Sequence, residues 1–118
     1  MIHQRVDRLR GLGIIRGVTI DIDPMKLGYT VLTFIGVVLE RPSEYKAVLK
    51  RFEDCPEVTE AYYTTGNYTF IMKVYSRSIK HLHQFLLERV QKIPQVRSTE
   101  TIVVLDAPLE RQFEVVDS

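Results

Sequence analysis

The stretch of sequence that decides the fold runs from Tyr29 to Leu39 and reads YTVLTFIGVVL. Successive side chains of a strand point to opposite faces, so alternate residues separate into two sets. One set consists of Tyr29, Val31, Thr33, Ile35, Val37 and Leu39, and the other carries Leu32, Phe34 and Val38. Because both sets are apolar, this stretch is predicted to be a strand that is covered on both faces.

A helix is predicted directly after this strand. Pro42 and Ser43 open it, with Ser43 as the expected N-cap, because a serine hydroxyl can accept a hydrogen bond from the first helical turn. Apolar residues at spacings of three and four form its buried stripe, namely Tyr45, Val48, Leu49 and Phe52. The pair Cys55-Pro56 is expected to end the helix.

Two further strands, Val58 to Thr65 and Tyr68 to Tyr75, flank the pair Gly66-Asn67. A Gly-Asn pair between alternating β-branched and aromatic residues predicts a hairpin with a two-residue turn.

A second helix follows, capped by Ser76 or Ser78 and ended by Pro94. Its apolar stripe comprises Ile79, Leu82, Leu86, Val90 and Ile93. A strand from Val96 to Leu105 comes next, and Leu109 to Val116 is expected to add a short tail strand.

From Tyr29 onward the order is strand, helix, strand, strand, helix, strand. This order predicts an α+β fold, a ferredoxin-like βαββαβ domain with a four-stranded antiparallel sheet and two helices on one face. A helix that Gly11 and Gly13 end, and a linking strand from Ile14 to Asp23, are predicted to precede it. The sheet face without helices would expose a large apolar patch, so at least an obligate dimer is expected.

Length and composition set limits on the function. The chain has 118 residues, 45% hydrophobic and 26% charged, with a formal net charge of +1, which suits one compact domain. Bulk charge favours neither nucleic acid nor a membrane as the partner of the whole chain. The longest uncharged stretch, Leu27 to Leu39, is too short to cross a bilayer, and a cytoplasmic protein is expected.

Catalytic and metal sites find little support in the residues. His81 and His83 lie two apart on a predicted helix and point in different directions, so they are not expected to share a metal ion. The single Cys55 forms no internal disulfide and is interpreted as a small buried residue. The hairpin run from Gly66 to Ile71 lacks the basic residue and alternating aromatics of an RNA-recognition motif. No catalytic residue, metal or cofactor is predicted.

Several segments taken together resemble the Lrp/AsnC family of transcription regulators. They begin with the helix Gln4-Arg5-Val6-x-Arg8-Leu9 and the segment Gly11-Leu12-Gly13-Ile14-Ile15-x-Gly17, and continue with Ile22-Asp23-Pro24-x-x-Leu27-Gly28. They end with Thr65-Gly66-Asn67-Tyr68 and Ile93-Pro94-x-Val96-x-x-Thr99-x-Thr101-x-x-Val104-Leu105. The resemblance covers essentially the whole chain in matching order and spacing.

The resemblance implies an N-terminal helix-turn-helix that reads DNA, a linking strand, and a ferredoxin-like domain that binds an amino acid or related small-molecule effector. It also implies homodimers paired sheet face to sheet face, which assemble further into tetramers, octamers or rings. The corresponding division is residues 1–13 for the end of the helix-turn-helix, 14–28 for the linking strand and connector, and 29–118 for effector binding and oligomerisation.

The sequence departs from the family at its start. A full member carries two further helices before the position of Met1, and without them a recognition helix does not dock stably in the major groove. The chain is therefore expected to be a fragment of a longer regulator or a shortened relative. Residues that match DNA-facing positions of the family are Gln4, Arg5 and Arg8; alternatively they form the exposed side of a short amphipathic helix.

A second departure lies at the effector site. The family's hairpin usually reads Gly-Asp-x-Asp, whereas this chain has Gly66-Asn67-Tyr68-Thr69, so both acidic positions are neutral. The residues expected on the effector side are Gly66, Asn67, Tyr68, Thr69, Thr99 and Thr101. Either the ligand is not an ordinary α-amino acid, or other residues hold its ammonium group, or the site is empty.

The preferred interpretation is a non-enzymatic Lrp/AsnC-type regulator that senses a small molecule and oligomerises. The first alternative is a stand-alone oligomerisation module that binds no small ligand. The second is a small enzyme on a ferredoxin-like sheet, such as an acylphosphatase, for which Arg41-Pro42-Ser43 gives only a partial match to a phosphate-binding loop.

Overall fold

The computed structural model describes residues 23–114. The helix and linking strand predicted before Asp23 therefore lie outside the described residues, as do Gln4, Arg5 and Arg8. A 3₁₀ turn (Pro24–Leu27) begins the described part, capped by the Asp23 carboxylate, which accepts a hydrogen bond from the Met25 amide at 3.0 Å.

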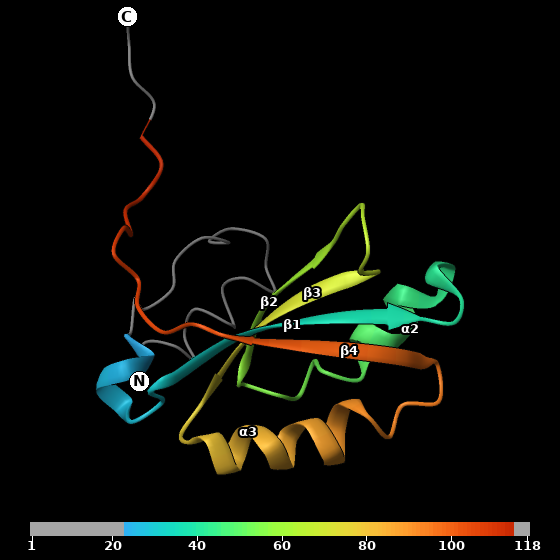
Figure 1. Cartoon of the computed structure of the whole chain (residues 1–118), viewed down its shortest axis with the longest axis horizontal. Coiled ribbons are helices and arrows are strands. Elements are labelled where there is room, and N and C mark those ends of the chain that lie inside the picture. Colours follow the sequence, from blue (N-terminus) through green and yellow to red (C-terminus); the bar gives the residue numbers. More distant parts are fainter. Residues whose placement is uncertain (1–22, 115–118) are drawn as a thin grey trace, which may run out of the picture.

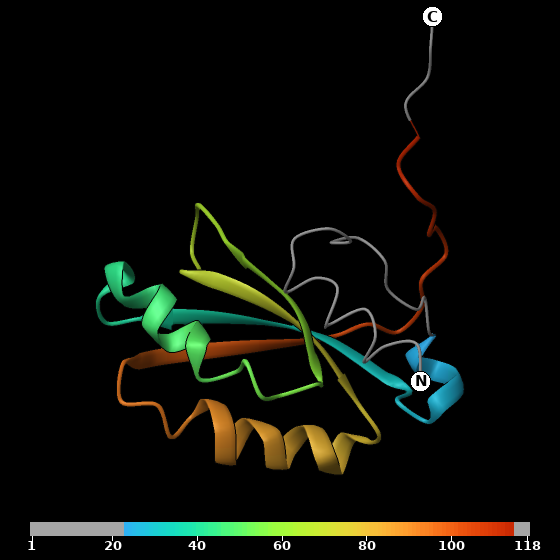
Figure 2. The same ribbon diagram turned by 180° about the vertical axis from the view of Figure 1, so that it is seen from behind.

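The predicted ferredoxin-like domain is confirmed. The order along the chain is β1 (Val31–Leu39), α2 (Tyr45–Lys50), β2 (Val58–Tyr63), β3 (Phe70–Ser76), α3 (Ile79–Phe85) and β4 (Val96–Val103). The strands form one antiparallel sheet in the order β2-β3-β1-β4, so β1 is central (Figure 1). From behind, α2 lies in front of the sheet and α3 runs alongside it (Figure 2).

The core lies between the sheet and the helices. Alternate residues of β1 and β3 point into it, among them Ile35, Val37, Phe70, Met72 and Val74, all with no exposed surface. The helices contribute Val48, Leu82 and Phe85 to the same cluster. We call this side of the sheet the helix face.

The opposite side of the sheet, which we call the outer face, carries no helix formed by residues 23–114. Its members follow from the strand register and are Leu32, Phe34, Gly36 and Val38 of β1, Ile71, Lys73 and Tyr75 of β3, Glu60 and Tyr62 of β2, and Ser98, Glu100 and Ile102 of β4. Tyr62 and Ile102 remain 53% and 48% exposed. A hydrogen bond from the Tyr62 hydroxyl to Glu60 raises the pKa of this tyrosine.

Arg89 joins the two helices at one end of the core. A π-helical turn (Leu86–Val90) extends α3 and carries this side chain. The guanidinium donates to the Arg51 carbonyl at 3.0 Å, just after α2, and to the Asp54 carboxylate at 2.9 Å. The hydrogen bond from Arg89 lowers the pKa of Asp54.

The start of the first helix differs from the prediction. Ser43 is not an N-cap, because the chain first forms a 3₁₀ turn (Pro42–Glu44) and α2 begins only at Tyr45, without a side-chain cap. The second helix does have a predicted cap, since the Ser78 hydroxyl accepts a hydrogen bond from the His81 amide at 3.1 Å.

Three further details of the prediction were wrong. Ile79 is 59% exposed rather than buried, because it stands at the first position of α3, beyond the sheet. The hairpin turn is longer than two residues, since β2 ends at Tyr63 and β3 begins at Phe70. No strand forms over residues 109–114, where Leu109 and Phe113 are 69% and 93% exposed. Within residues 23–114, no helix has both the length and the apolar character needed to cross a bilayer.

The two isoleucines Ile35 and Ile79 give a direct test of this packing. Ile35→Ala should lower the free energy of unfolding by about 2–5 kcal/mol, because it removes a fully buried side chain from the centre of β1. Ile79→Ala should change it by less than about 0.5 kcal/mol. Urea denaturation followed by circular dichroism would measure both, and equal losses would contradict the assignment of the core.

Candidate functional site

A pocket of about 560 Å³ opens at the end of the sheet where β1 ends and the β2–β3 loop turns. Four predicted effector residues line it together: Gly66, Asn67, Tyr68 and Thr69. The remaining lining residues are Val38, Leu39, Glu40, Pro42, Tyr63, Thr64, Thr65 and Arg97. The structure thus gathers the hairpin, the end of β1 and the start of β4 around one hollow.

The shape of the β2–β3 loop is fixed by hydrogen bonds between its two arms. The Thr64 amide donates to the Thr69 carbonyl at 3.2 Å, and the Thr64 hydroxyl donates to the Tyr68 carbonyl at 3.3 Å. Gly66 has φ +98°, a left-handed conformation that side-chain-bearing residues rarely adopt. The glycine is therefore needed for the shape of the loop.

Thr69 anchors the loop to the central strand. Its amide donates to the Val37 carbonyl at 2.7 Å, and its hydroxyl accepts a hydrogen bond from the Leu39 amide at 3.1 Å. The side chain is 7% exposed. Because its hydroxyl already binds the backbone of β1, the first task of Thr69 is to position the loop.

Tyr68 belongs to the pocket and to the outer face at the same time. Its ring lies against Gly36, where an added Cβ would come within 2.5 Å of a ring carbon. Its hydroxyl donates a hydrogen bond to Glu100, the residue that pairs with Gly36 across β1 and β4. The side chain therefore crosses from the loop onto the middle of the sheet.

Thr99 and Thr101 do not line the pocket with the loop residues. Thr99 pairs with Val37 and Thr101 pairs with Ile35, and both partners are fully buried on the helix face. Directly opposite residues of paired strands share a face. The two threonines therefore point to the helix side of the edge strand β4 and are half-buried there.

Sequence reasoning missed the two charged residues of the pocket, Glu40 and Arg97. Glu40 follows β1 directly, and Arg97 lies near the start of β4. Tyr63 was missed as well; its ring stacks on that of Tyr45 with 4.0 Å between centroids. Local sequence patterns carry little information about these positions, because the pocket is formed by segments far apart in the chain.

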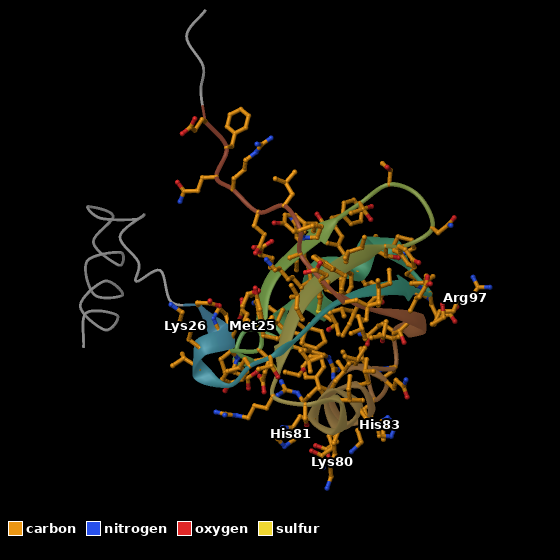
Figure 3. All side chains as sticks on the ribbon, turned by 60° about the vertical axis from the view of Figure 1, so that its left-hand side comes forward. Met25, Lys26, Lys80, His81, His83 and Arg97 are labelled. Carbon is orange, nitrogen blue, oxygen red and sulfur yellow. The ribbon has the colours of Figure 1, made fainter. Side chains whose placement is uncertain are left out.

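The groups considered for chemistry in the sequence lie elsewhere. Cys55 is 3% exposed, and burial raises the pKa of its thiol, which disfavours the reactive thiolate. His81 and His83 lie on either side of α3 in the end-on view of Figure 3. Residues 23–114 contain no cluster of three histidine, cysteine or carboxylate groups arranged to hold a metal ion.

Comparison with known proteins gives consistent matches. A family model described as the Lrp/AsnC ligand binding domain matches residues 30–112. The regulatory protein AsnC of Escherichia coli K12 is 46% identical over 113 residues, which are 96% of this chain and 74% of that protein. The HTH-type transcriptional regulator FL11 of Pyrococcus horikoshii is 38% identical over 104 residues, which are 88% of this chain and 68% of that protein.

Solved structures agree with these matches. The structure of E. coli AsnC has a TM-score of 0.77 at 45% identity, covering 95% of this chain and 75% of that chain. A feast or famine regulatory protein from M. tuberculosis, complexed with L-methionine, has a TM-score of 0.72 at 25% identity, covering 95% of this chain and 75% of that chain.

The contact between Tyr68 and Gly36 can be tested by a double-mutant cycle. In an open strand position, alanine would stabilise relative to glycine by about 0.5–1 kcal/mol. Gly36→Ala should instead cost roughly 1–3 kcal/mol of unfolding free energy, since the new Cβ must displace the Tyr68 ring. In a Tyr68→Ala background the same substitution should become neutral or stabilising. Additive effects in urea denaturation would contradict the contact.

Proposed function

The chain belongs to the Lrp/AsnC family, and on this premise we propose that it is the sensing and oligomerising part of a transcriptional regulator that binds an amino acid effector. Of the relatives named above, one is a regulatory protein and the other an HTH-type transcriptional regulator. The proposed division keeps residues 1–13 and 14–28 as the end of the helix-turn-helix and its linking strand, followed by the effector domain at 29–118. Gln4, Arg5 and Arg8 are the proposed DNA contacts when the helix-turn-helix is complete.

The pocket beside the β2–β3 loop is the proposed effector site. It is large enough for a small molecule, and backbone groups of the loop approach it closely at Gly66. One relative of similar fold is known as a complex with L-methionine, which supports an amino acid as the class of ligand. Thr99 and Thr101 are proposed to contribute to binding only where an associated copy extends the site.

The outer face is the proposed dimer interface. Phe34 of β1 pairs with Ile102 of β4 on one side and with Lys73 of β3 on the other, and Ile71 lies two residues from Lys73 on the same face of β3. Lys73 forms an ion pair with Glu60 of the edge strand β2. Interfaces between protein copies combine apolar residues with a smaller number of charged ones, as this face does. A homodimer that assembles further into a tetramer or octamer is the proposed state.

The observation that carries this proposal is the position of Tyr68. The residue lines the effector pocket and lies on the outer face over Gly36. A ligand that moves the β2–β3 loop must also move a ring within the proposed interface. Differential affinity of the effector for two assembly states would then change the spacing of the attached DNA-binding heads.

Amino acid titration tests the proposed ligand class. Each of the twenty standard L-amino acids is added singly to the protein, and the melting temperature is recorded. At a hundredfold excess over its Kd, a ligand should stabilise the folded protein by about 2.7 kcal/mol. Gly66→Val, which strains a left-handed position, should reduce the ligand-induced rise in melting temperature more than it reduces the melting temperature of the free protein. No response to any amino acid would favour the alternative of an oligomerisation module without a ligand.

An aspartate on each side of the sheet tests the proposed interface. Ile102→Asp should weaken self-association by a factor of ten or more, since it places an unpaired charge next to Phe34 in the proposed interface. Leu87→Asp is the matched control, because Leu87 is exposed to a similar degree, 45%, but lies in the π-helical turn after α3. Sedimentation velocity over a concentration series measures both, and equal behaviour of the two variants would contradict the interface.

A further inference from the structure

We propose that Glu40 and Arg97 select the effector by its two charges, with Glu40 binding an ammonium group and Arg97 binding a carboxylate. This inference rests on the proposed effector site and assigns residues that hold the ends of a zwitterion there. Both residues line the pocket, and neither belongs to the hairpin that sequence reasoning singled out.

The charge content of the pocket carries the argument. Of all the residues that line it, only Glu40 and Arg97 are of charged types; the other side chains are apolar, hydroxyl, phenol or amide groups. The pocket thus offers one anion and one cation. A ligand with one ammonium and one carboxylate matches both, whereas a dianion or a polyamine would leave one protein charge opposed by a like charge.

A β-bulge determines the direction of Arg97. Val38 pairs with Ser98, but the next residue, Leu39, pairs with Val96, so Arg97 is an extra residue with no partner on β1. A bulge interrupts strand alternation and re-aims the side chain that it carries. In Figure 3, Arg97 projects beyond the end of the sheet instead of packing on a face.

Glu40 is fixed by the same pair of strands. Its amide donates to the Gln95 carbonyl at 2.9 Å, which continues the pairing of β1 with the chain that leads into β4. The backbone that carries the Glu40 carboxylate is therefore restrained. Its bonding partner Gln95 lies two residues before the bulged Arg97. Such restraint lowers the entropic cost of placing a charge against a ligand.

The two charges do not neutralise each other. Among residues 23–114, the ion pairs within 4 Å join Arg41 with Glu44, Lys73 with Glu60, and Arg89 with Asp54. Glu40 and Arg97 therefore form no ion pair with each other, and both charges stay available to a ligand in the pocket that they line.

Glu40 also resolves the question raised by the neutral hairpin. The loop offers Asn67 and Thr69 where an acidic pair would meet an ammonium group, and the Thr69 hydroxyl is already bound to β1. Glu40 supplies a carboxylate from a different segment. An amino acid can therefore be the ligand even though the hairpin lacks acidic residues.

The test compares one ligand with its singly charged analogues. The standard L-amino acid that gives the largest thermal shift is measured by calorimetry, together with its α-amide, which lacks the carboxylate, and its 2-hydroxy acid, which lacks the ammonium group. Each analogue should bind the protein roughly tenfold more weakly, since each loses one charge-assisted hydrogen bond.

Two variants assign the charges to their residues. Glu40→Gln should weaken the amino acid roughly tenfold but leave the 2-hydroxy acid unchanged, and Arg97→Gln should weaken the amino acid similarly but leave the α-amide unchanged. Arg41→Gln and Glu44→Gln are matched controls, because they remove the same charges next to the pocket without lining it. All four positions are exposed or half-buried, so the variants should fold.

The outcomes separate the two proposals. If the wild-type protein binds an amino acid and Glu40→Gln and Arg97→Gln bind it equally well, this inference is overturned while the proposed function stands. If the protein binds none of the amino acids, the proposed function fails and this inference fails with it. If each of the two variants binds the amino acid more weakly but binds the analogue that lacks the matching charge as well as the wild type does, both proposals are supported.

Discussion

Both described helices pack on one face of the sheet, which leaves the outer face to be covered, we propose, by a second copy. This constraint follows from β1, whose two sets of alternate residues are both apolar. Helices α2 and α3 cover the set that includes Ile35 and Val37, which are fully buried. The set that includes Phe34 stays partly open, beside Ile102 at 48% exposure. Burial of such a surface is the main force that favours association of protein copies.

Gly36 connects this constraint to the pocket. A side chain at this position would occupy the middle of the outer face; its absence lets the Tyr68 ring lie there instead. The loop that forms the effector pocket therefore contributes an aromatic ring to the surface where a second copy is proposed to pack. One residue placed in both sites provides a short physical route for coupling between them.

The sequence was sufficient to predict the fold because the elements differ clearly in their periodicity. It was weaker wherever the outcome depended on register between strands. The spacing of Thr99 and Thr101 places them on one face of β4, but only their pairing with Val37 and Ile35 shows that this face is turned toward the helices. Arg97 is re-aimed by a bulge that no local pattern indicates. Gly36 drew no attention because its role depends on Tyr68, which lies far along the chain.

The hairpin shows the same limitation at short range. The pair Gly66-Asn67 correctly located the connection, but the predicted two-residue turn was wrong. The Thr69 amide and hydroxyl bond to β1, its carbonyl still accepts a hydrogen bond from the Thr64 amide, and Gly66 turns the loop with a left-handed φ. The bonds to β1 join the loop to a strand far away in the sequence, and a local motif does not indicate them.

The mass of the protein in solution tests the central claim most directly, namely that a second copy covers the outer face. Sedimentation equilibrium of the chain, whose mass is 13.7 kDa, should show a dimer or a multiple of a dimer at micromolar concentration. A single species of 13.7 kDa across the micromolar range would contradict the account.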